Sequence, residues 1–347
     1  MAANGSRAGT PRIGVIGAGG LGFHHIRILR EMPDFQFVGF VESRGDRARE
    51  VASDLDVRSY PTLDAILDDV DALTIVVPTP LHFDVAKAAL LRGKHVMIEK
   101  PITTTLEQAD ELLAIAQSTG ALIQTGHVER FNRAVRAALP YVHEPRFIES
   151  DRLAPFNLRG SDVAVVLDLM IHDIDLVLTL VGGSAADIAA VGVPVLTPMV
   201  DIANARVTFT SGAVANITAS RISRERFRKV RIFQASGYLS LDLASGSGEF
   251  YRLKKTPDFT GSLHGLALGG VHSPTPDLAD FVDRIALEAP EGEPLRLEFE
   301  SFAAAIRGET PVAVTGEDGR RALQVALRIV ADIDQNMASL RAQLHGA

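Results

Sequence analysis

Asp168 and His172 place a carboxylate and an imidazole at a spacing that suits chemistry on an alcohol. They lie four positions apart in an otherwise almost wholly apolar segment, and Asp175 continues the same edge. In a helix, that spacing puts both side chains on one face, one turn apart. Burying ionisable groups there is costly unless they are paired or functional. A histidine that titrates near neutrality beside a carboxylate suits general base catalysis. We therefore predict that His172 is a general base supported by Asp168.

Two other interpretations of this pair stay open. The residues could form a buried structural pair, or Asp168 could cap a helix that starts later. They could also be two metal ligands, but no third candidate has convincing spacing, so we predict no metal site. The chain has no cysteine, which excludes disulfides, thiolate catalysis and cysteine metal sites.

Lys100 is a third candidate catalytic residue. It follows an apolar strand at residues 95–98 and stands between Glu99 and Pro101. A lysine at the carboxyl end of a strand, facing a cofactor cleft, can polarise a carbonyl or stabilise an alkoxide. The alternative is a surface lysine beside a turn.

A glycine-rich turn precedes all three residues in the chain. Residues 13–16 suit a short buried strand, residues 23–32 continue as a helix, and Gly17, Gly19 and Gly22 fit the pattern G-x-G-x-x-G. Glycine allows the tight turn, the close approach of a pyrophosphate and close helix packing. The N–H groups that open the helix would hold the phosphates. The predicted dinucleotide-binding residues in this turn are Gly17, Ala18, Gly19, Gly20, Leu21 and Gly22.

Glu42 is the expected partner of the adenosine ribose. It ends a second apolar strand at residues 35–41 and lies twenty residues after Gly22, about where that acid is expected. Its charge would repel a 2′-phosphate, so we predict NAD rather than NADP, although Arg44 is close enough to weaken this preference. Ser43 and Arg44 are included in the predicted cofactor site.

The first part of the chain alternates strands and helices. Further strands are expected at residues 71–77, 95–98 and 122–125, with helices at residues 83–92 and 103–120. Such alternation predicts a doubly wound parallel sheet, the Rossmann arrangement, whose ligands lie beyond the carboxyl ends of the strands. Pro78, Thr79, Glu99 and Lys100 fall at those ends and join the predicted cofactor site. His82 is included as well, although it could equally cap its own helix.

The pattern changes after Gly126, so we expect an NAD(P)-binding Rossmann domain at residues 1–125 and an α+β domain at residues 126–347. In the second domain we expect a long helix at residues 162–181. Strands follow at residues 203–210, 213–219, 229–235 and 238–243, with hairpin turns at Ser211-Gly212 and Ser236-Gly237. This pattern predicts a large, open-faced, mostly antiparallel sheet. Helices are expected at residues 276–289, 298–307 and 316–340, and residues 256–276 could be exposed or mobile.

Composition limits the class of protein. Hydrophobic residues make up 46% of the 347 residues, charged residues make up 22%, and the net charge is −8. That charge argues against nucleic acid as the main partner. No apolar run approaches the roughly 18 residues of a membrane helix, and the first ten residues lack the apolar core of a signal peptide. We therefore expect a cytoplasmic protein without a membrane partner.

Together these motifs resemble the glucose-fructose oxidoreductase / inositol dehydrogenase family, Gfo/Idh/MocA. The matching pieces are the glycine turn with His25, Pro78-Thr-Pro-Leu-His82, Gly93-Lys-His-Val-Met-Ile-Glu-Lys-Pro101 and Asp168-Leu-Met-Ile-His-Asp173. The resemblance implies an NAD(P)-dependent sugar or polyol dehydrogenase. It also implies Lys100 and His172 as the catalytic pair, with Asp168 in support. An enzyme that recycles tightly held NAD, or a non-catalytic NAD-binding sensor, are the alternatives.

Within that family, Gly126-His-Val-Glu-Arg-Phe-Asn132 resembles members that oxidise UDP-N-acetylglucosamine at C3, although Arg133 stands where proline is expected. This resemblance implies a sugar or nucleotide-sugar substrate. A cluster of arginines at residues 221–231 is either a solvated strand edge or an anion site, and Arg152 and Arg159 share that ambiguity. We also expect a homodimer or homotetramer formed through the second-domain sheet. The candidate substrate-binding residues are His127, Arg130, Arg152 and Arg159.

Overall fold

The computed structural model describes residues 9–157, 160, 162–254 and 281–345. These residues form two compact units, and neither unit is continuous in sequence. Of the described residues, the first unit takes 9–131, 166–175 and 292–331, and the second takes 132–157, 160, 162–165, 176–254, 281–291 and 332–345. This division differs from the expected single boundary after residue 125. Two later segments return to the first unit because their side chains complete its core.

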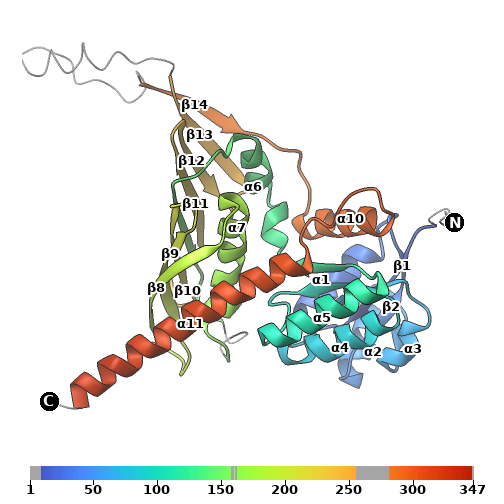
Figure 1. Cartoon of the computed structure of the whole chain (residues 1–347). Helices are drawn as coiled ribbons and strands as arrows, with labels where there is room; N and C mark the ends of the chain where they lie inside the picture. The colour runs from blue at the N-terminus through green and yellow to red at the C-terminus, as the bar shows by residue number, and fades with distance from the viewer. Residues whose placement is uncertain (1–8, 158–159, 161, 255–280, 346–347) are drawn as a thin grey trace, which may run out of the picture. The chain divides into compact units, whose positions relative to one another are not determined.

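The first unit is built on a six-stranded parallel sheet (Figure 1). Its strand order is β3-β2-β1-β4-β5-β6, so the chain moves outward in one direction from β1 and then in the other. This confirms the predicted doubly wound fold, whose ligands sit where the strand order reverses, here between β1 and β4. The strands are β1 (Arg12–Ile16), β2 (Gln36–Val41), β3 (Ser59–Tyr60), β4 (Ala72–Ile75), β5 (His95–Glu99) and β6 (Ile123–Gly126).

Alternation of side chains along the strands creates a separate core on each face of this sheet. Ile16 and Ile75 belong to one buried cluster, whereas Ile13 and Val15 belong to the other. Successive strand residues point to opposite faces, and both faces are covered, so the strands are apolar throughout. The helices and helical turns that precede β7 are α1 (Gly20–Leu29), α2 (Gly45–Leu55), α3 (Leu63–Leu67), η1 (Thr79–Leu81), α4 (His82–Leu91), α5 (Leu106–Thr119), η2 (Val128–Phe131), α6 (Arg133–Ala138) and η3 (Leu139–Tyr141).

Helix α10 (Pro294–Ile306) belongs to the first unit although it lies near the end of the chain. Phe299 packs edge-on against His25 of α1, and Phe302 contacts Phe35. Both phenylalanines are fully buried in the same cluster as β1. Burying a side chain of this size contributes about 2–3 kcal/mol, which explains why the parallel sheet recruits a helix so distant in sequence.

The second unit carries an eight-stranded sheet with the order β14-β13-β12-β11-β7-β10-β9-β8 (Figure 1). All neighbours pair antiparallel except β7 and β10, which are parallel. The predicted mostly antiparallel sheet is confirmed. Its strands are β7 (Phe147–Leu153), β8 (Ala185–Val193), β9 (Ile202–Phe209), β10 (Val214–Ser220), β11 (Phe227–Gln234), β12 (Gly237–Asp242), β13 (Ser247–Leu253) and β14 (Val282–Leu287).

One predicted helix is wrong. Residues 276–289 were expected to be helical, but β14 (Val282–Leu287) is a strand that pairs with β13 over its whole length. Its sequence also has helical potential, and the open edge of β13 overrides that local preference by offering backbone partners. The expectation for residues 256–276 lies outside the described residues.

The helix that carries Asp168 also differs from expectation. It was expected to begin at residue 162, but the regular part starts as a π-helical turn, η4 (Val166–Met170), followed by α7 (Ile171–Val181). Single π turns are rare and often mark functional sites. The last helix, α11 (Gly316–His345), begins at its predicted start.

Candidate active site

The glycine turn contains two glycines that the fold requires and one that the fold does not require. Gly17 has φ +94°, and a Cβ at this position would lie 2.6 Å from the Val76 carbonyl oxygen. A Cβ on Gly22 would lie 2.0 Å from the Gly17 carbonyl oxygen. A Cβ on Gly19 would meet nothing within 4 Å. The space at Gly19, at the N-terminus of α1, therefore fits the close approach of a pyrophosphate to the backbone.

Glu42 follows β2 and binds the same turn. One carboxylate oxygen accepts the Ala18 N–H at 2.9 Å and the other accepts the Arg44 N–H at 3.0 Å. Burial opposes ionisation, but these two backbone hydrogen bonds and the Arg44 guanidinium keep the pKa of Glu42 below its ordinary value. Only 8% of the Glu42 side chain is exposed, against 64% for Arg44. A charged carboxylate therefore sits beside the turn, as a ribose partner requires.

His82 is held by protein groups at the carboxyl ends of two strands. Its Nδ1 lies 2.9 Å from the Pro101 carbonyl oxygen, and its Nε2 lies 2.9 Å from that of Val77. The side chain is buried, and burial lowers its pKa. His82 therefore joins the loop after β4, which includes Pro78 and Thr79, to the loop after β5. Its burial favours a role in shaping the cofactor site over direct contact with a ligand.

Lys100 and Asp168 are brought together by the structure. Lys100 Nζ donates a 2.5 Å hydrogen bond to the Asp168 carbonyl oxygen and lies 3.7 Å from its carboxylate. The lysine follows β5 directly, at a cis Lys100–Pro101 peptide, and the aspartate lies in the π turn η4. The two side chains keep 16% and 28% of their surface exposed, so both can meet a ligand. Asp168 is thus a partner of Lys100, whereas the sequence paired it with His172.

Glu99 links the start of the loop after β5 to α1, and one of its carboxylate oxygens accepts the Lys100 backbone N–H at 3.3 Å. Its carboxylate lies 3.2 Å from His25 Nε2, and the other ring nitrogen of His25 lies 3.0 Å from the Thr74 hydroxyl. Burial raises the pKa of Glu99, but its bond to His25 and the nearby charges outweigh that effect, so its pKa is lowered. Glu99 therefore anchors α1 to the sheet, which favours a structural role beneath the cofactor site.

Arg130 is engaged by protein partners. Its guanidinium forms a bidentate pair with Asp175 at 2.5 and 2.7 Å, and a further bond to Asp318 at 3.2 Å. The Asp175 side chain is 1% exposed. This network joins η2, α7 and the start of α11, so Arg130 has a structural role in the unit, and the predicted substrate contact stays a prediction. The sequence pointed to Asp175 but gave no signal for Asp318.

The other arginines singled out by the sequence differ in their exposure where the structure describes them. Arg152 lies in β7 and is only 2% exposed, which leaves little surface for a substrate. Arg159 lies outside the described residues. Arg221 is buried and donates to the carbonyl oxygens of Gly160 and Val163, at 2.5 and 2.6 Å. Arg224 and Arg226 are exposed, in agreement with the solvated edge that was one of the two interpretations.

Two buried groups of the first unit differ from the sequence prediction. Glu298 was not singled out, and His127 was predicted to have another role. Glu298 of α10 is fully buried, and both carboxylate oxygens lack a hydrogen-bond partner among the described residues. Burial, reinforced by the charges of Glu99 and Asp175, raises the pKa of Glu298 well above its ordinary value. The position of Glu298 between Leu297 and Phe299 was the available signal. His127, predicted to touch substrate, is 1% exposed and packs edge-on against His172.

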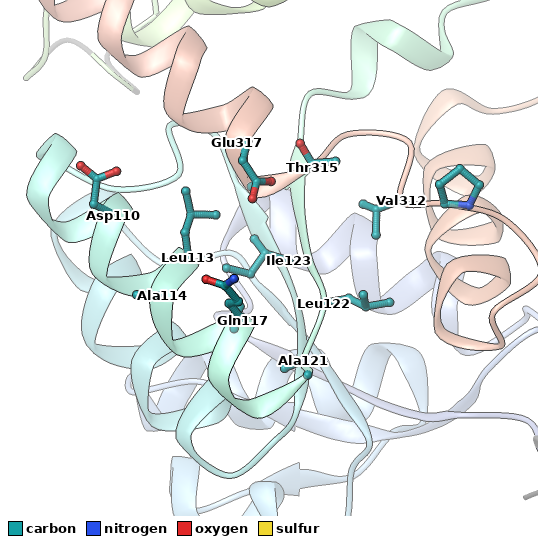
Figure 2. Close-up of a pocket in the computed structure, with 14 residues that line it drawn as sticks. Asp110, Leu113, Ala114, Gln117, Ala121, Leu122, Ile123, Val312, Thr315 and Glu317 are labelled. Atoms are coloured by element: carbon teal, nitrogen blue, oxygen red, sulfur yellow. The ribbon is translucent and has the colours of Figure 1, made fainter. Parts of the chain in front are cut away.

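A hollow of about 780 Å³ lies elsewhere in this unit (Figure 2). It is lined by Leu113 and Gln117 of α5, by Leu122 and Ile123 around the start of β6, and by residues 311–312 and 315–317. Because ligands of doubly wound sheets bind beyond the carboxyl ends of the strands, this hollow at the amino end of β6 is not the dinucleotide site. Within the described ranges, no three His, Asp or Glu side chains group as metal ligands, and no helix is long and apolar enough to cross a membrane.

Comparison with known proteins agrees with this geometry. The family model described as "Oxidoreductase family, NAD-binding Rossmann fold" matches residues 11–127, and the GFO/IDH/MocA C-terminal domain matches residues 136–240. The chain is 39% identical over 323 residues to UDP-N-acetylglucosamine 3-dehydrogenase of Acidithiobacillus ferrooxidans, covering 92% of this chain and 96% of that protein. The chain belongs to the Gfo/Idh/MocA family.

Members of known structure share the whole architecture. The UDP-N-acetylglucosamine 3-dehydrogenase from A. ferrooxidans superposes with a TM-score of 0.84 at 36% identity, covering 94% of this chain and 98% of that one. A levoglucosan dehydrogenase in complex with NADH and levoglucosan has a TM-score of 0.80 at 19% identity, covering 94% and 97%, which shows the common fold. A scyllo-inositol 2-dehydrogenase (NAD⁺) of Bacillus subtilis is 27% identical over 231 residues, 61% of this chain and 68% of that protein. This Gfo/Idh/MocA protein is therefore an oxidoreductase of the class that acts on CH–OH groups.

Proposed function

We propose that this protein oxidises the 3-hydroxyl of UDP-N-acetylglucosamine to a ketone, with NAD as the hydride acceptor. The observation that carries the proposal is the contact of Lys100 with Asp168 at the carboxyl end of β5, in the same unit as the glycine turn. The relative with 39% identity supports the choice of substrate. The space at Gly19 and the carboxylate of Glu42 support a dinucleotide.

Each side chain has a distinct task in this proposal. His172 is partly exposed and removes the proton of the hydroxyl as the C–H bond breaks. The ammonium group of Lys100 stabilises the negative charge that develops on that oxygen. Asp168 holds Lys100 in place through its carbonyl oxygen and carboxylate, which costs the lysine freedom but fixes its direction. When bound, the nicotinamide supplies the hydride acceptor.

The test is NADH formation by purified protein with NAD and a panel of UDP-N-acetylglucosamine, free N-acetylglucosamine and myo-inositol. Lys100→Met and His172→Gln should each lower kcat by about 100-fold or more, the usual size of a general acid-base contribution, while NADH binding stays near wild type. Lys87→Met and His24→Gln are matched controls, because Lys87 is about two-fifths exposed and His24 is exposed.

Three results would contradict the proposal in different ways. Full turnover in both Lys100→Met and His172→Gln would show that these residues do not take part in catalysis. Turnover of inositol but not of the nucleotide sugar would agree with the proposed reaction but contradict the proposed substrate. Reduction of bound cofactor without net NADH release would indicate an enzyme that recycles its cofactor.

The preference for NAD rests on Glu42. Its carboxylate has a lowered pKa and lies beside the glycine turn, so a 2′-phosphate would meet a fixed negative charge. Glu42→Gln should raise the ratio of kcat/KM for NADP to that for NAD by about tenfold, or about 1.4 kcal/mol. Glu50→Gln, on the exposed face of α2, is the control. An unchanged ratio in Glu42→Gln would show that the cofactor preference is set elsewhere.

The second-unit sheet supports a homo-oligomer. Val191 and Val193 of β8, and Val195 and Leu196 after it, expose between 47% and 62% of their surface. Clusters of exposed apolar side chains often mark interfaces. Light scattering should therefore give at least a dimer for the wild type, and a smaller species for the double variant Val191→Glu/Val193→Glu. Leu91→Glu, at an equally exposed position of the first unit, should leave the mass unchanged.

A further inference from the structure

His127 lies buried against His172. The ring centroids are 6.5 Å apart and the ring planes are nearly perpendicular, at 85°. His127 is 1% exposed, and neither of its ring nitrogens has a hydrogen-bond partner among the described residues. A buried polar ring that forgoes its hydrogen bonds is costly. Packing alone would be served better by an apolar side chain, so the imidazole needs a different explanation.

We propose that His127 is a positioning residue for His172. It fixes the plane of the His172 ring by edge-on packing and stabilises that ring once it has taken the substrate proton. This inference rests on the proposed role of His172 as the base. The proton moves from the substrate hydroxyl to a ring nitrogen of His172 and goes no further, so His127 neither gains nor loses a proton.

The charges around His127 explain why its ring stays neutral. Burial lowers its pKa, and the cations Arg130 and Lys100 lower it further, against the carboxylates of Asp175 and Glu99. Beyond these groups, Asp318 pairs with Arg130, and α10, which packs on η2, adds the buried Glu298. A neutral imidazole packed edge-on stabilises a neighbouring imidazolium as aromatic rings stabilise cations, whereas a charged ring would repel it.

Direct contact between His127 and substrate is the less favoured role because almost none of its surface is accessible. The position is also fixed by the backbone. The His127 N–H donates to the Thr125 carbonyl oxygen at 2.8 Å, directly after β6, and η2 begins at the next residue. The ring therefore stands at the carboxyl end of a strand, packed edge-on against His172.

The experiment compares His127→Leu with His127→Gln. Leucine removes the ring and both nitrogens, whereas glutamine retains polar atoms at a similar length. In His127→Leu we expect kcat to fall by about tenfold with little change in KM, since the loss is in proton transfer. The midpoint of the acidic limb of kcat/KM should move to lower pH by about half a unit or more, because the imidazolium of His172 loses a stabilising neighbour. His127→Gln should recover part of both.

A measurement without substrate separates this inference from the proposed function. NMR titration of the His172 ring should show a lower pKa in His127→Leu than in the wild type, and an intermediate value in His127→Gln. His95→Gln, at the opposite end of β5, should leave that titration unchanged. If the His172 titration and the acidic limb are both the same in all folded variants, His127 does not act on His172. If the titration moves but no sugar is oxidised, the proposed function fails and the coupling stands.

Discussion

Gly19→Ala provides a direct test of where the cofactor phosphates bind. The structure shows no atom within 4 Å of a Cβ built on Gly19, and its backbone is in an extended conformation at φ −62° and ψ −165° that alanine adopts without strain. The free energy of unfolding without cofactor should therefore stay within about 0.5 kcal/mol of wild type, or rise slightly because alanine restricts the unfolded chain. The new methyl group would project into the space that a bound pyrophosphate needs.

The expected loss of affinity follows from the hydrogen bonds that the methyl group displaces. A hydrogen bond to a charged group contributes about 1.5–3 kcal/mol, so losing one such bond between the α1 N-terminus and a phosphate weakens NADH binding by about 10- to 100-fold. Calorimetric titration with NADH gives the dissociation constant, and thermal unfolding of the protein without cofactor gives the stability. In this variant we expect weaker NADH binding and a nearly unchanged stability without cofactor.

Gly22→Ala is the matched comparison. Its Cβ would lie 2.0 Å from the Gly17 carbonyl oxygen, a backbone atom that cannot swing aside. This variant should lose stability even without cofactor. If Gly19→Ala bound NADH as tightly as wild type, the space at Gly19 would not be the phosphate site, and the reasoning from the glycine turn would be refuted.

Three further predictions concern stability. Asp201 accepts three backbone N–H bonds, which lower its pKa to about 2 from 3.8. The lowered pKa stabilises the fold by about 2 kcal/mol above pH 4, and this contribution is lost as the pH falls toward 2. When wild type and Asp201→Asn are compared under conditions that give them equal stability at neutral pH, acid unfolding should begin at higher pH in wild type. Glu298 has a raised pKa, so its contribution to the stability of the fold is complete below its ordinary pKa and is lost as the pH rises. The melting temperature of Glu298→Gln relative to that of wild type should therefore increase from pH 5 to pH 9. Arg130→Met should lower the free energy of unfolding by about 3–5 kcal/mol, because it removes the guanidinium that pairs with the buried carboxylate of Asp175.

Each of these predictions has an outcome that contradicts it. An acid transition with the same midpoint in Asp201→Asn would mean that the three N–H bonds do not favour the ionised form. A melting-temperature difference for Glu298→Gln that is flat with pH would mean that Glu298 titrates normally. Arg133→Met, which removes a more exposed arginine paired with an exposed glutamate, is the control for Arg130→Met and should change stability by about 1 kcal/mol or less.

Much of the candidate site was accessible from sequence because it depends on local chemistry. The turn needs glycine at Gly17 because of its φ of +94°, and at Gly22 because of the nearby Gly17 carbonyl, and Glu42 directly after β2 lies beside the turn. Alternating apolar strands and helices force a sheet that is buried on both faces. These are rules of spacing and backbone conformation, and one chain segment suffices to express them.

The partners of those residues were decided by the tertiary structure. Asp168 contacts Lys100, which is 68 positions away in the chain, and no local pattern links the two residues. Arg130 pairs with Asp175 and Asp318, and only Asp175 was singled out by the sequence pattern. The sequence position of a side chain limits where it can lie. The packing of distant segments determines which charged groups lie close enough to pair with it.

The same distinction explains the domain organisation and β14. A sequence reading divides the chain where its pattern changes, after residue 125, yet the segments 166–175 and 292–331 belong to the first unit. Phe299 and Phe302 return to the parallel sheet because its core leaves room for them, and Val282–Leu287 becomes a strand because β13 offers an open edge. The sequence by itself determined the glycine turn, the fold class and the chemistry of the catalytic candidates. The tertiary structure decided their partners, since burial and backbone pairing depend on segments that local patterns do not connect.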